Sequence, residues 1–153
     1  MTASLKPEEF DLMPTLGDVA RHHGRTRASQ PALSFEGRNT SYAELDAHSN
    51  QVASAMLAAG VEPGDCVAYL GKNSDHYYEI VFGVAKIGVV IAPIGWRLSP
   101  DEVAYIIDDA QAHLLFVGPE CMACAEAAVA ATGAHPAIIA MEAGDHGHPV
   151  YEA

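Results

Sequence analysis

The stretch AKIGVVIAPIGWRLSPDEVAYIIDD, residues 85–109, carries the signals that decide the fold of this chain. Its apolar run at residues 89–94 does not alternate with polar residues, which is typical of a strand covered on both faces of a parallel sheet. The tetrapeptide SPDE, residues 99–102, places a hydroxyl at the helix N-cap, a proline at the first helical position and two acids in the first turn. The stretch therefore predicts a buried strand, a loop and a capped helix, and capping explains the paired carboxylates without a catalytic role.

The same pattern continues on both sides of this stretch. Apolar runs recur at about the spacing that a strand, a crossover helix and two short loops require. They occupy residues 66–70, 89–94, 114–117 and 137–141, and helical segments at 75–86, 100–110 and 120–132 follow or separate them. We therefore expect an α/β fold, an open doubly wound parallel sheet with helices on both faces.

The N-terminal part of the chain predicts smaller elements. Thr15 can cap a helix that runs to about residue 27, where its periodicity ends. Residues 32–36 read as a short strand, residues 37–39 as a tight turn and residues 40–41 as the returning strand.

A long helix should follow, because Ser41 and Glu44 form a capping box and Gly60 can end the helix. We expect its buried face to consist of Leu45, Ser49, Val52, Ala53, Met56 and Leu57. The predicted organisation is a flexible N-terminal segment at residues 1–13, an α/β subdomain at 14–141 and a disordered tail at 142–153.

Composition narrows the class of protein. Half of the 153 residues are hydrophobic and 18% are charged, which is typical of a folded domain. We expect a cytoplasmic protein, since the sequence shows neither a signal peptide nor an apolar run long enough to span a membrane. The formal net charge of −12 argues against nucleic-acid binding. It also makes this piece alone a poor candidate for holding ATP or coenzyme A, so the basic groups for their phosphates are expected to come from elsewhere.

Three short motifs have a plausible alternative to a functional interpretation. The CxxC at residues 121–124 has the spacing of redox and zinc sites, but a lone CxxC is weak and zinc needs four ligands, so coincidence in an Ala-rich helix is favoured. The role of its two cysteines, Cys121 and Cys124, is left open. Residues 71–74, GKNS, do not match the phosphate-loop pattern, and the HGH at 146–148 is expected to be solvated.

Trp96 and Arg97 lie in the loop between the apolar strand and the capped helix. Parallel α/β proteins bind ligands at the carboxyl ends of their strands, so the only tryptophan of the chain is a candidate binding residue there. The alternative is that Trp96 covers the end of the sheet and that Arg97 pairs with Asp108 or Asp109.

Three blocks in order resemble the adenylate-forming (AMP-binding) superfamily, and within it the fatty-acyl-CoA synthetase or acyl-CoA ligase branch. The blocks are TSYAEL at residues 40–45; GDCVA at 64–68 with Asn73 and Ser74; and AKIG at 85–88 with Pro93, WRLS at 96–99 and Glu102. The resemblance covers roughly residues 15–141. Cys66 and Gly95 depart from it, since the family usually has Arg and Asn there.

The resemblance implies a parent enzyme that activates a fatty acid or other carboxylate with ATP and magnesium and transfers the acyl group to coenzyme A, yielding acyl-CoA, AMP and pyrophosphate. It assigns no catalytic residue, metal ligand or cofactor to this chain, because the family's phosphate loop, ribose-binding aspartate and catalytic lysine are expected after residue 153. It places Gly88, Gly95 and Trp96 near the acyl or coenzyme A channel. Such an enzyme can be peripheral to a membrane.

The leading hypothesis is therefore an N-terminal part of an acyl-CoA ligase that is inactive by itself. A different class of function is a non-catalytic interaction or regulatory module on the same scaffold, in which an exposed sheet edge supports a dimer. A redox or zinc protein built on the CxxC is a third. The sequence leaves acyl chain length, a fatty or an aryl acid, and the oligomeric state open.

Overall fold

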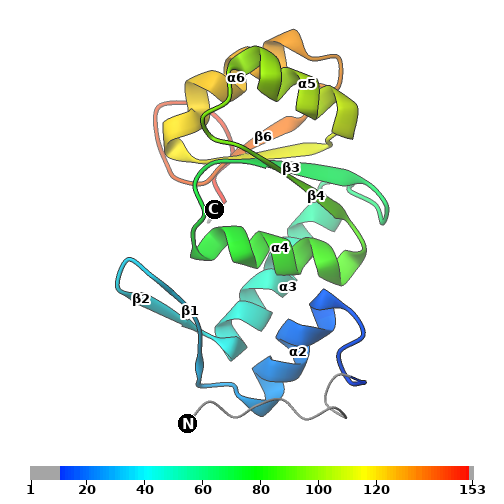
Figure 1. The fold of residues 1–153 in the computed structure, drawn as a ribbon, viewed down its shortest axis with the longest axis vertical. Helices are drawn as coiled ribbons and strands as arrows, with labels where there is room; N and C mark the ends of the chain where they lie inside the picture. The colour runs from blue at the N-terminus through cyan, green and yellow to red at the C-terminus, as the bar shows by residue number, and fades with distance from the viewer. Residues whose placement is uncertain (1–10, 152–153) are drawn as a thin grey trace. The chain divides into compact units, whose positions relative to one another are not determined.

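The structure, a computed structural model, describes residues 11–151. Residues 1–10 and 152–153 lie outside the described part, and so does most of the N-terminal segment that we expected to be flexible. The chain forms two compact units (Figure 1). The first unit contains residues 11–60 and Ser74–Gly88, and the second contains Val61–Asn73 and residues 89–151.

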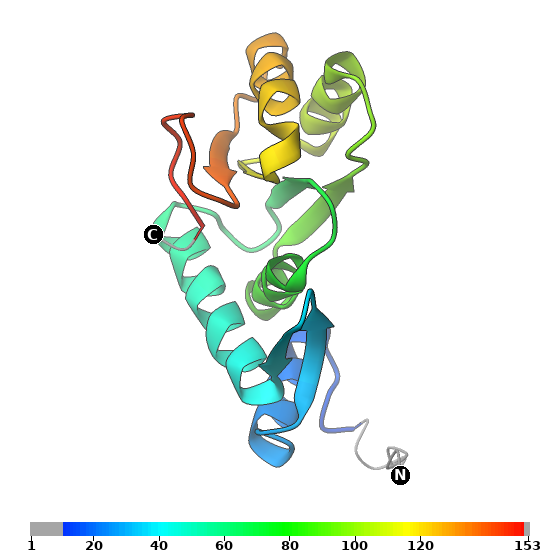
Figure 2. The same cartoon turned by 90° about the vertical axis from the view of Figure 1, so that its left-hand side faces the viewer.

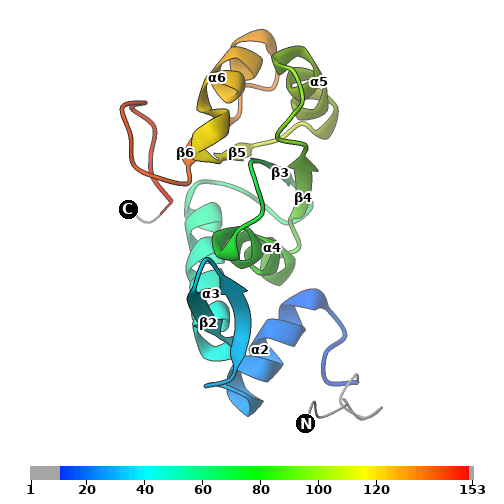
Figure 3. The same ribbon diagram turned by 60° about the vertical axis from the view of Figure 1, so that its left-hand side comes forward.

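The first unit packs helices against one another beside a β-hairpin (Figure 3). Its elements are α2 (Leu16–Thr26), β1 (Pro31–Phe35), β2 (Arg38–Ser41), α3 (Tyr42–Ala58) and α4 (Asp75–Ile87). The predicted helix starts are confirmed: the Thr15 hydroxyl accepts the Asp18 N–H, and Ser41 and Glu44 form the capping box. Local side-chain chemistry thus sets where α2 and α3 begin.

Two local predictions for this unit are wrong. The hairpin turn is centred on Glu36 and Gly37, whose φ angles are 48° and 81°, and Arg38 is already paired in β2. Positive φ at both turn residues twists the chain in the sense that the flanking strands require, so two residues suffice where we expected three. Leu57 is 48% exposed and does not belong to the buried face of α3, because it follows Met56 around the helix toward solvent.

The second unit is a parallel sheet whose own two α-helices lie on the same face (Figures 1 and 2). Its strands are β3 (Cys66–Leu70), β4 (Val90–Ile94), β5 (Leu114–Val117) and β6 (Ala137–Ala140), and its helices are α5 (Pro100–Ala110), the 3₁₀ turn η1 (Pro119–Cys121) and α6 (Met122–Ala131). The strands lie in the order β4-β3-β5-β6, all parallel. The predicted α/β fold, an open doubly wound parallel sheet, is confirmed; of its crossover helices, α5 and α6 belong to this unit and α4, between β3 and β4, belongs to the first.

The core of this unit lies where α5 and α6 cover β3 and β5. It includes the fully buried residues Leu70, Val103, Ile107, Leu115, Val117, Ala125 and Ala128. Each of the larger aliphatic side chains contributes roughly 1.5–3 kcal/mol when it leaves water. The four apolar runs of the sequence correspond to β3, β4, β5 and β6, and two of these strands, β3 and β5, have neighbouring strands on both sides.

The strand β4 differs from this pattern because it is an edge of the sheet. Val90 is 56% exposed and Pro93 is exposed, although the sequence predicted a strand covered on both faces. The Val90 N–H donates to Asp65 O, so the alternating backbone turns Pro93 toward the open side of β4. A proline is tolerated there because it has no N–H to contribute to a ladder.

The other edge strand is partly covered by the end of the described chain. The Ala140 N–H donates to Pro149 O and the Tyr151 N–H donates to Ala140 O, both at 2.8 Å. Disorder of residues 142–153 stays a prediction, as do the domain boundaries at residues 14 and 141. Within residues 11–151, no helix has both the length and the apolar character that a membrane crossing needs.

Candidate functional site

The order in which the strands are connected reverses between β3 and β5, so the carboxyl ends of these two strands form a topological switch point. These two strands are neighbours, but β3 leads to β4 on one side while β5 leads to β6 on the other. In open α/β sheets the loops that diverge at such a point leave a crevice, and ligands bind there. The loops in question begin at Gly71 and Gly118.

The two glycines bring these loops into direct backbone contact. A Cβ atom on Gly71 would lie 3.1 Å from Gly118 N and 3.2 Å from Gly118 Cα, so a larger residue would have to push the loops apart. The Gly118 N–H also donates to Leu70 O at 2.9 Å. The residues that follow each glycine therefore emerge close together.

Lys72 follows the first of these glycines and is fixed through its backbone. The Tyr69 hydroxyl donates to Lys72 O at 2.7 Å, and the Lys72 N–H donates to Glu120 Oε1 at 3.3 Å. Its ammonium lies 3.7 Å from the same Glu120 oxygen and 5.0 Å from the centre of the Trp96 ring. Glu120 thus connects the loop after β3 with η1, which follows β5.

Trp96 stands in the loop after β4 and receives a second cation. The Arg97 guanidinium carbon lies 4.2 Å from the centre of the indole ring, within the range of a cation–π contact. The indole is 39% exposed, so its ring remains accessible beside the two cations. We call Lys72, Trp96, Arg97 and Glu120 the strand-end cluster.

The sequence identified only part of this cluster. Trp96 and Arg97 were candidates because they follow an apolar strand, whereas Lys72 and Glu120 were missed. They also follow predicted strands, but their meeting depends on the strand order, which the sequence does not display. The alternative role for Arg97 was pairing with Asp108 or Asp109. Among the described residues Arg97 makes no ion pair with either carboxylate; it lies on Trp96, and Asp108 has other partners.

Asp108 instead anchors the connection from α6 to β6. Its Oδ1 accepts hydrogen bonds from the Thr132 hydroxyl, from Gly133 N at 2.9 Å and from Ala134 N at 3.0 Å. The hydrogen bond from Thr132, followed by those backbone N–H groups, lowers the pKa of the Asp108 carboxyl despite some desolvation.

Gly88 and Gly95 have different surroundings. Gly88 is the C-cap of α4 in the first unit, with φ 69° and its N–H donating to Val84 O, so a glycine is required there to end the helix. Gly95 lies in the second unit beside Trp96, and a Cβ at Gly95 would meet Leu98 at an ordinary 3.5 Å. Their assignment to a substrate channel stays a proposal.

The CxxC cysteines face the backbone of the loop that carries Trp96. Cys121 Sγ lies 3.9 Å from Trp96 O, and Cys124 Sγ lies 3.7 Å from Leu98 O. Burial raises the pKa of both thiols, and Glu120 raises that of Cys121 further. The cysteines therefore lack the lowered thiol pKa that redox CxxC motifs use. Among residues 11–151, no group of three or more His, Cys, Asp and Glu side chains is arranged to hold a metal ion.

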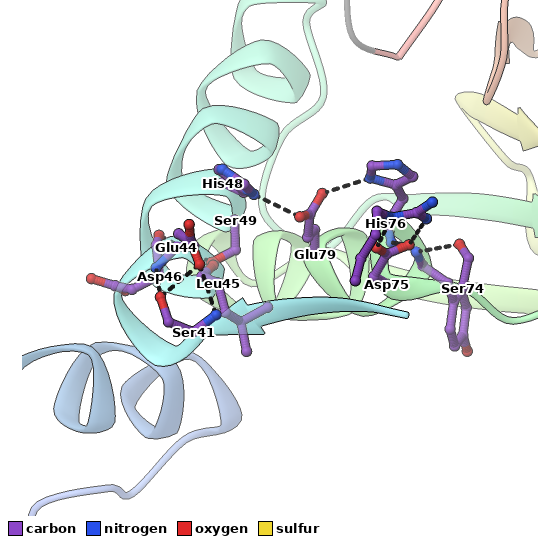
Figure 4. A network of polar contacts seen from close by, with 12 residues as sticks. Ser41, Glu44, Leu45, Asp46, His48, Ser49, Ser74, Asp75, His76 and Glu79 are labelled. Atoms are coloured by element: carbon purple, nitrogen blue, oxygen red, sulfur yellow. Dashed lines mark hydrogen bonds and ion pairs between the residues drawn. The ribbon is translucent and has the colours of Figure 1, made fainter. Parts of the chain in front are cut away.

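The first unit contains a polar network of its own, centred on Glu79 of α4 (Figure 4). The Glu79 carboxylate is 4% exposed and lies between two imidazoles, 2.7 Å from His48 Nδ1 and 3.1 Å from His76 Nδ1. Beside it, Arg38 donates two hydrogen bonds of 3.1 Å to the buried Asp75. The network joins the hairpin and α3 to the start of α4.

Asp75 is ionised through this arrangement. Burial alone would raise the pKa of its carboxyl, but the hydrogen bonds from Arg38 and the charges of His76 and Arg38 outweigh burial and hold the pKa below its usual value. The carboxylate also accepts the His76 N–H at the first turn of α4, where the helix dipole favours a negative charge.

Lys86 makes a second polar junction near the end of α4. Its side chain is only 3% exposed, and its ammonium donates to Asp46 Oδ1 at 2.6 Å and to Asp46 O at 2.9 Å. Ser49 Oγ and Asn50 Oδ1, both at 2.8 Å, complete its shell of acceptors. These contacts tie α4 to α3.

Comparison with known proteins adds the family to this geometry. A family model described as AMP-binding enzyme matches residues 20–151. Over 108 residues the chain is 46% identical to the fatty acid–[acyl-carrier-protein] ligase ScoC of Streptomyces coeruleorubidus, a match that covers 71% of this chain and 21% of the relative. It is 35% identical over 135 residues to the indoleacetate–CoA ligase of Aromatoleum aromaticum, covering 88% of this chain and 26% of the relative.

A solved structure of a CoA ligase has a similar fold over most of this chain. The anthranilate CoA ligase AuaEII, crystallised in complex with anthranoyl-AMP, superposes with a TM-score of 0.86 at 26% identity, over 97% of this chain and 29% of that chain. The chain thus spans about a fifth to a quarter of the length of the two curated relatives. Because the family model matches most of the sequence, the chain belongs to the AMP-binding enzyme family.

Proposed function

We propose that this chain forms the N-terminal part of an ATP-dependent ligase that joins a carboxylic acid, in the first instance a fatty acid, to the thiol of coenzyme A. The carboxylate attacks the α-phosphate of ATP and releases pyrophosphate, and the thiol then displaces AMP from the acyl-adenylate. Family membership supports the use of ATP, magnesium and a thiol acceptor. The fatty acid is supported by the ScoC relative, while the indoleacetate relative supports an aryl-substituted acid as the alternative.

The strand-end cluster is the observation that carries this chain's own part in the reaction. Lys72 and Arg97 both lie on the ring of a half-exposed tryptophan at the carboxyl ends of parallel strands. Two cations beside an aromatic face can bind a phosphate-bearing ligand with a planar base or an apolar stem, and coenzyme A has all of these groups. Gly95 and Trp96 would then line the channel along which the acyl group and the thiol meet, with Gly88 as a further candidate.

We propose that other parts of such a ligase supply the rest of the chemistry. The segment GKNS at residues 71–74 lacks the phosphate-loop pattern. We therefore assign no residue here to ATP or magnesium, and the chain alone should give no ATP–pyrophosphate exchange with any fatty acid. Measurable exchange by the purified chain would contradict this assignment.

Binding of coenzyme A to the full chain tests the cluster directly, because Trp96 is its only tryptophan and reports through its fluorescence. A saturable change of emission is expected. Lys72→Met and Arg97→Met should each weaken binding by about 2- to 5-fold, as expected when one partly exposed charge is lost. Arg25→Met removes an exposed positive charge from the other unit and is the matched control. No saturable change at millimolar coenzyme A would overturn the proposed role.

A further inference from the structure

We propose that Glu120 is a positioning residue that regulates the strand-end cluster: its carboxylate holds Lys72 in place and competes with an anionic ligand for the Lys72 ammonium. This inference rests on the proposed function, since it requires that the cluster bind an anion. Glu120 is the second residue after Gly118 and lies in η1, which follows β5.

Glu120 acts on Lys72 in two separate ways. Its Oε1 accepts the Lys72 backbone N–H at 3.3 Å, which fixes the direction in which the Lys72 side chain leaves the loop. The same oxygen lies 3.7 Å from the ammonium, which itself stands over the Trp96 ring. One contact is a hydrogen bond that any acceptor could make, and the other depends on a negative charge.

The charge of Glu120 opposes the charge that makes the cluster attractive to anions. Lys72 and Arg97 bring two positive charges to the indole, and Glu120 returns one negative charge at contact distance from Lys72. An arriving anion must therefore share the ammonium with Glu120 or displace it. The same two charges act on the thiol of the neighbouring Cys121. Burial is the main cause of its raised pKa, and Glu120 raises this pKa more than Lys72 lowers it.

The solvent exposure of Lys72 and Glu120 allows an anion to compete with Glu120 for the Lys72 ammonium. The Lys72 side chain is 60% exposed and the Glu120 side chain is 29% exposed, so an ion in solution can reach the pair without unfolding the loops. An exposed ion pair of this type is weak, so replacing the Glu120 carboxylate by another anion costs little free energy. An anion must therefore bind the Lys72 ammonium more strongly than the Glu120 carboxylate does. A ligand with a higher negative charge, or with additional contacts to the cluster, meets this requirement.

Two substitutions separate the roles of Glu120 in the full chain, with coenzyme A as the probe and Trp96 emission as the readout. Glu120→Gln keeps an acceptor for the Lys72 N–H but removes the charge, and it should tighten binding by about 2- to 5-fold. Glu120→Ala removes both, so its gain should be smaller than that of Glu120→Gln. Glu126→Gln is the matched control, because Glu126 carries the same charge in the same unit and pairs with His148 instead.

A double-mutant cycle supplies a readout that a merely structural role would not move. In a Lys72→Met background, Glu120→Gln should leave the affinity unchanged, because the ammonium it competes for is gone. The inference is overturned if Glu120→Gln changes affinity no more than Glu126→Gln does, or if its effect persists without Lys72. If the wild-type chain gives no saturable signal, the proposed function fails first; if it binds and these variants do not differ, only the role of Glu120 fails.

Discussion

The two units of this chain are stabilised by different kinds of interaction. The first buries His23, Ser49, Asp75 and Glu79 among its helices, whereas the described residues of the second bury fewer polar side chains, namely Thr132 and the Tyr69 phenol. In the second unit the backbone ladder of the sheet satisfies the buried polar groups, so its side chains can be apolar. Helices satisfy only their own backbone, and their mutual orientation has to be specified by side chains.

The difference shows which part of the molecule tolerates change. A buried polar network is costly to break at one partner, because the other partner is left without compensation. An apolar core loses stability in proportion to the atoms removed. Four sets of variants test this contrast, and they follow from the largest expected effect to the smallest.

Leu115→Ala should produce the largest loss. Leu115 is fully buried in β5, and truncating it removes apolar contacts and leaves a cavity, which costs about 3–4 kcal/mol. Leu57→Ala is the matched control, since Leu57 is 48% exposed and its truncation should cost less than about 1 kcal/mol. Urea unfolding followed by circular dichroism measures both. Similar losses for the two leucines would contradict the placement of the core.

Lys86→Met should lower the free energy of unfolding by about 2–3 kcal/mol, because the partly buried Asp46 carboxylate and the Ser49 hydroxyl lose the hydrogen bonds that the Lys86 ammonium donates to them. Lys72→Met removes the same group from a side chain that is 60% exposed and should leave stability nearly unchanged. The comparison uses the same urea transition. A gain of stability in Lys86→Met would show that the first unit does not depend on buried polar contacts.

Arg38→Gln tests the ionised Asp75 through pH. The folded-state pKa of Asp75 is lowered, so its interaction with Arg38 stabilises the protein above about pH 4 and is lost as the pH falls through the folded-state value. The variant should lose up to about 1 kcal/mol at pH 7, and the difference from wild type should vanish in strong acid. Thermal unfolding at a series of pH values measures this, with Arg25→Gln as the control. A difference that does not change with pH would contradict the role of the ion pair.

Asp108→Asn should have the smallest effect on global stability, because the amide oxygen can still accept hydrogen bonds from the backbone. It loses the negative charge that strengthens them, so the amides of Gly133 and Ala134 should exchange with solvent faster. Residue-resolved hydrogen exchange reports this, and Asp109→Asn, at an exposed neighbour, is the control. Unchanged exchange at both amides would remove Asp108 as the anchor of this connection.

The sequence allowed more of the second unit to be predicted than of the first unit's polar network. The strands and helices of the second unit were predicted closely because continuous apolar runs and the SPDE cap are local signals. The contacts of Glu79 with His48 and His76 could not be predicted, since these side chains meet only once α3 packs on α4. The same holds for Lys72 and Glu120, which the strand order brings together from 48 residues apart.

The proline on the open side of β4 has a consequence for association between molecules. Along this edge the amides alternate, and the outward position that Pro93 occupies has no hydrogen to offer, which leaves Ile91 as the outward donor between Val90 and Ile94. A strand from another copy would find an interrupted template at this edge. A strand of another copy that paired with β4 would lack a hydrogen bond at Pro93, so a dimer formed through β4 would have to rely more on side-chain contacts, such as those of the exposed Val90.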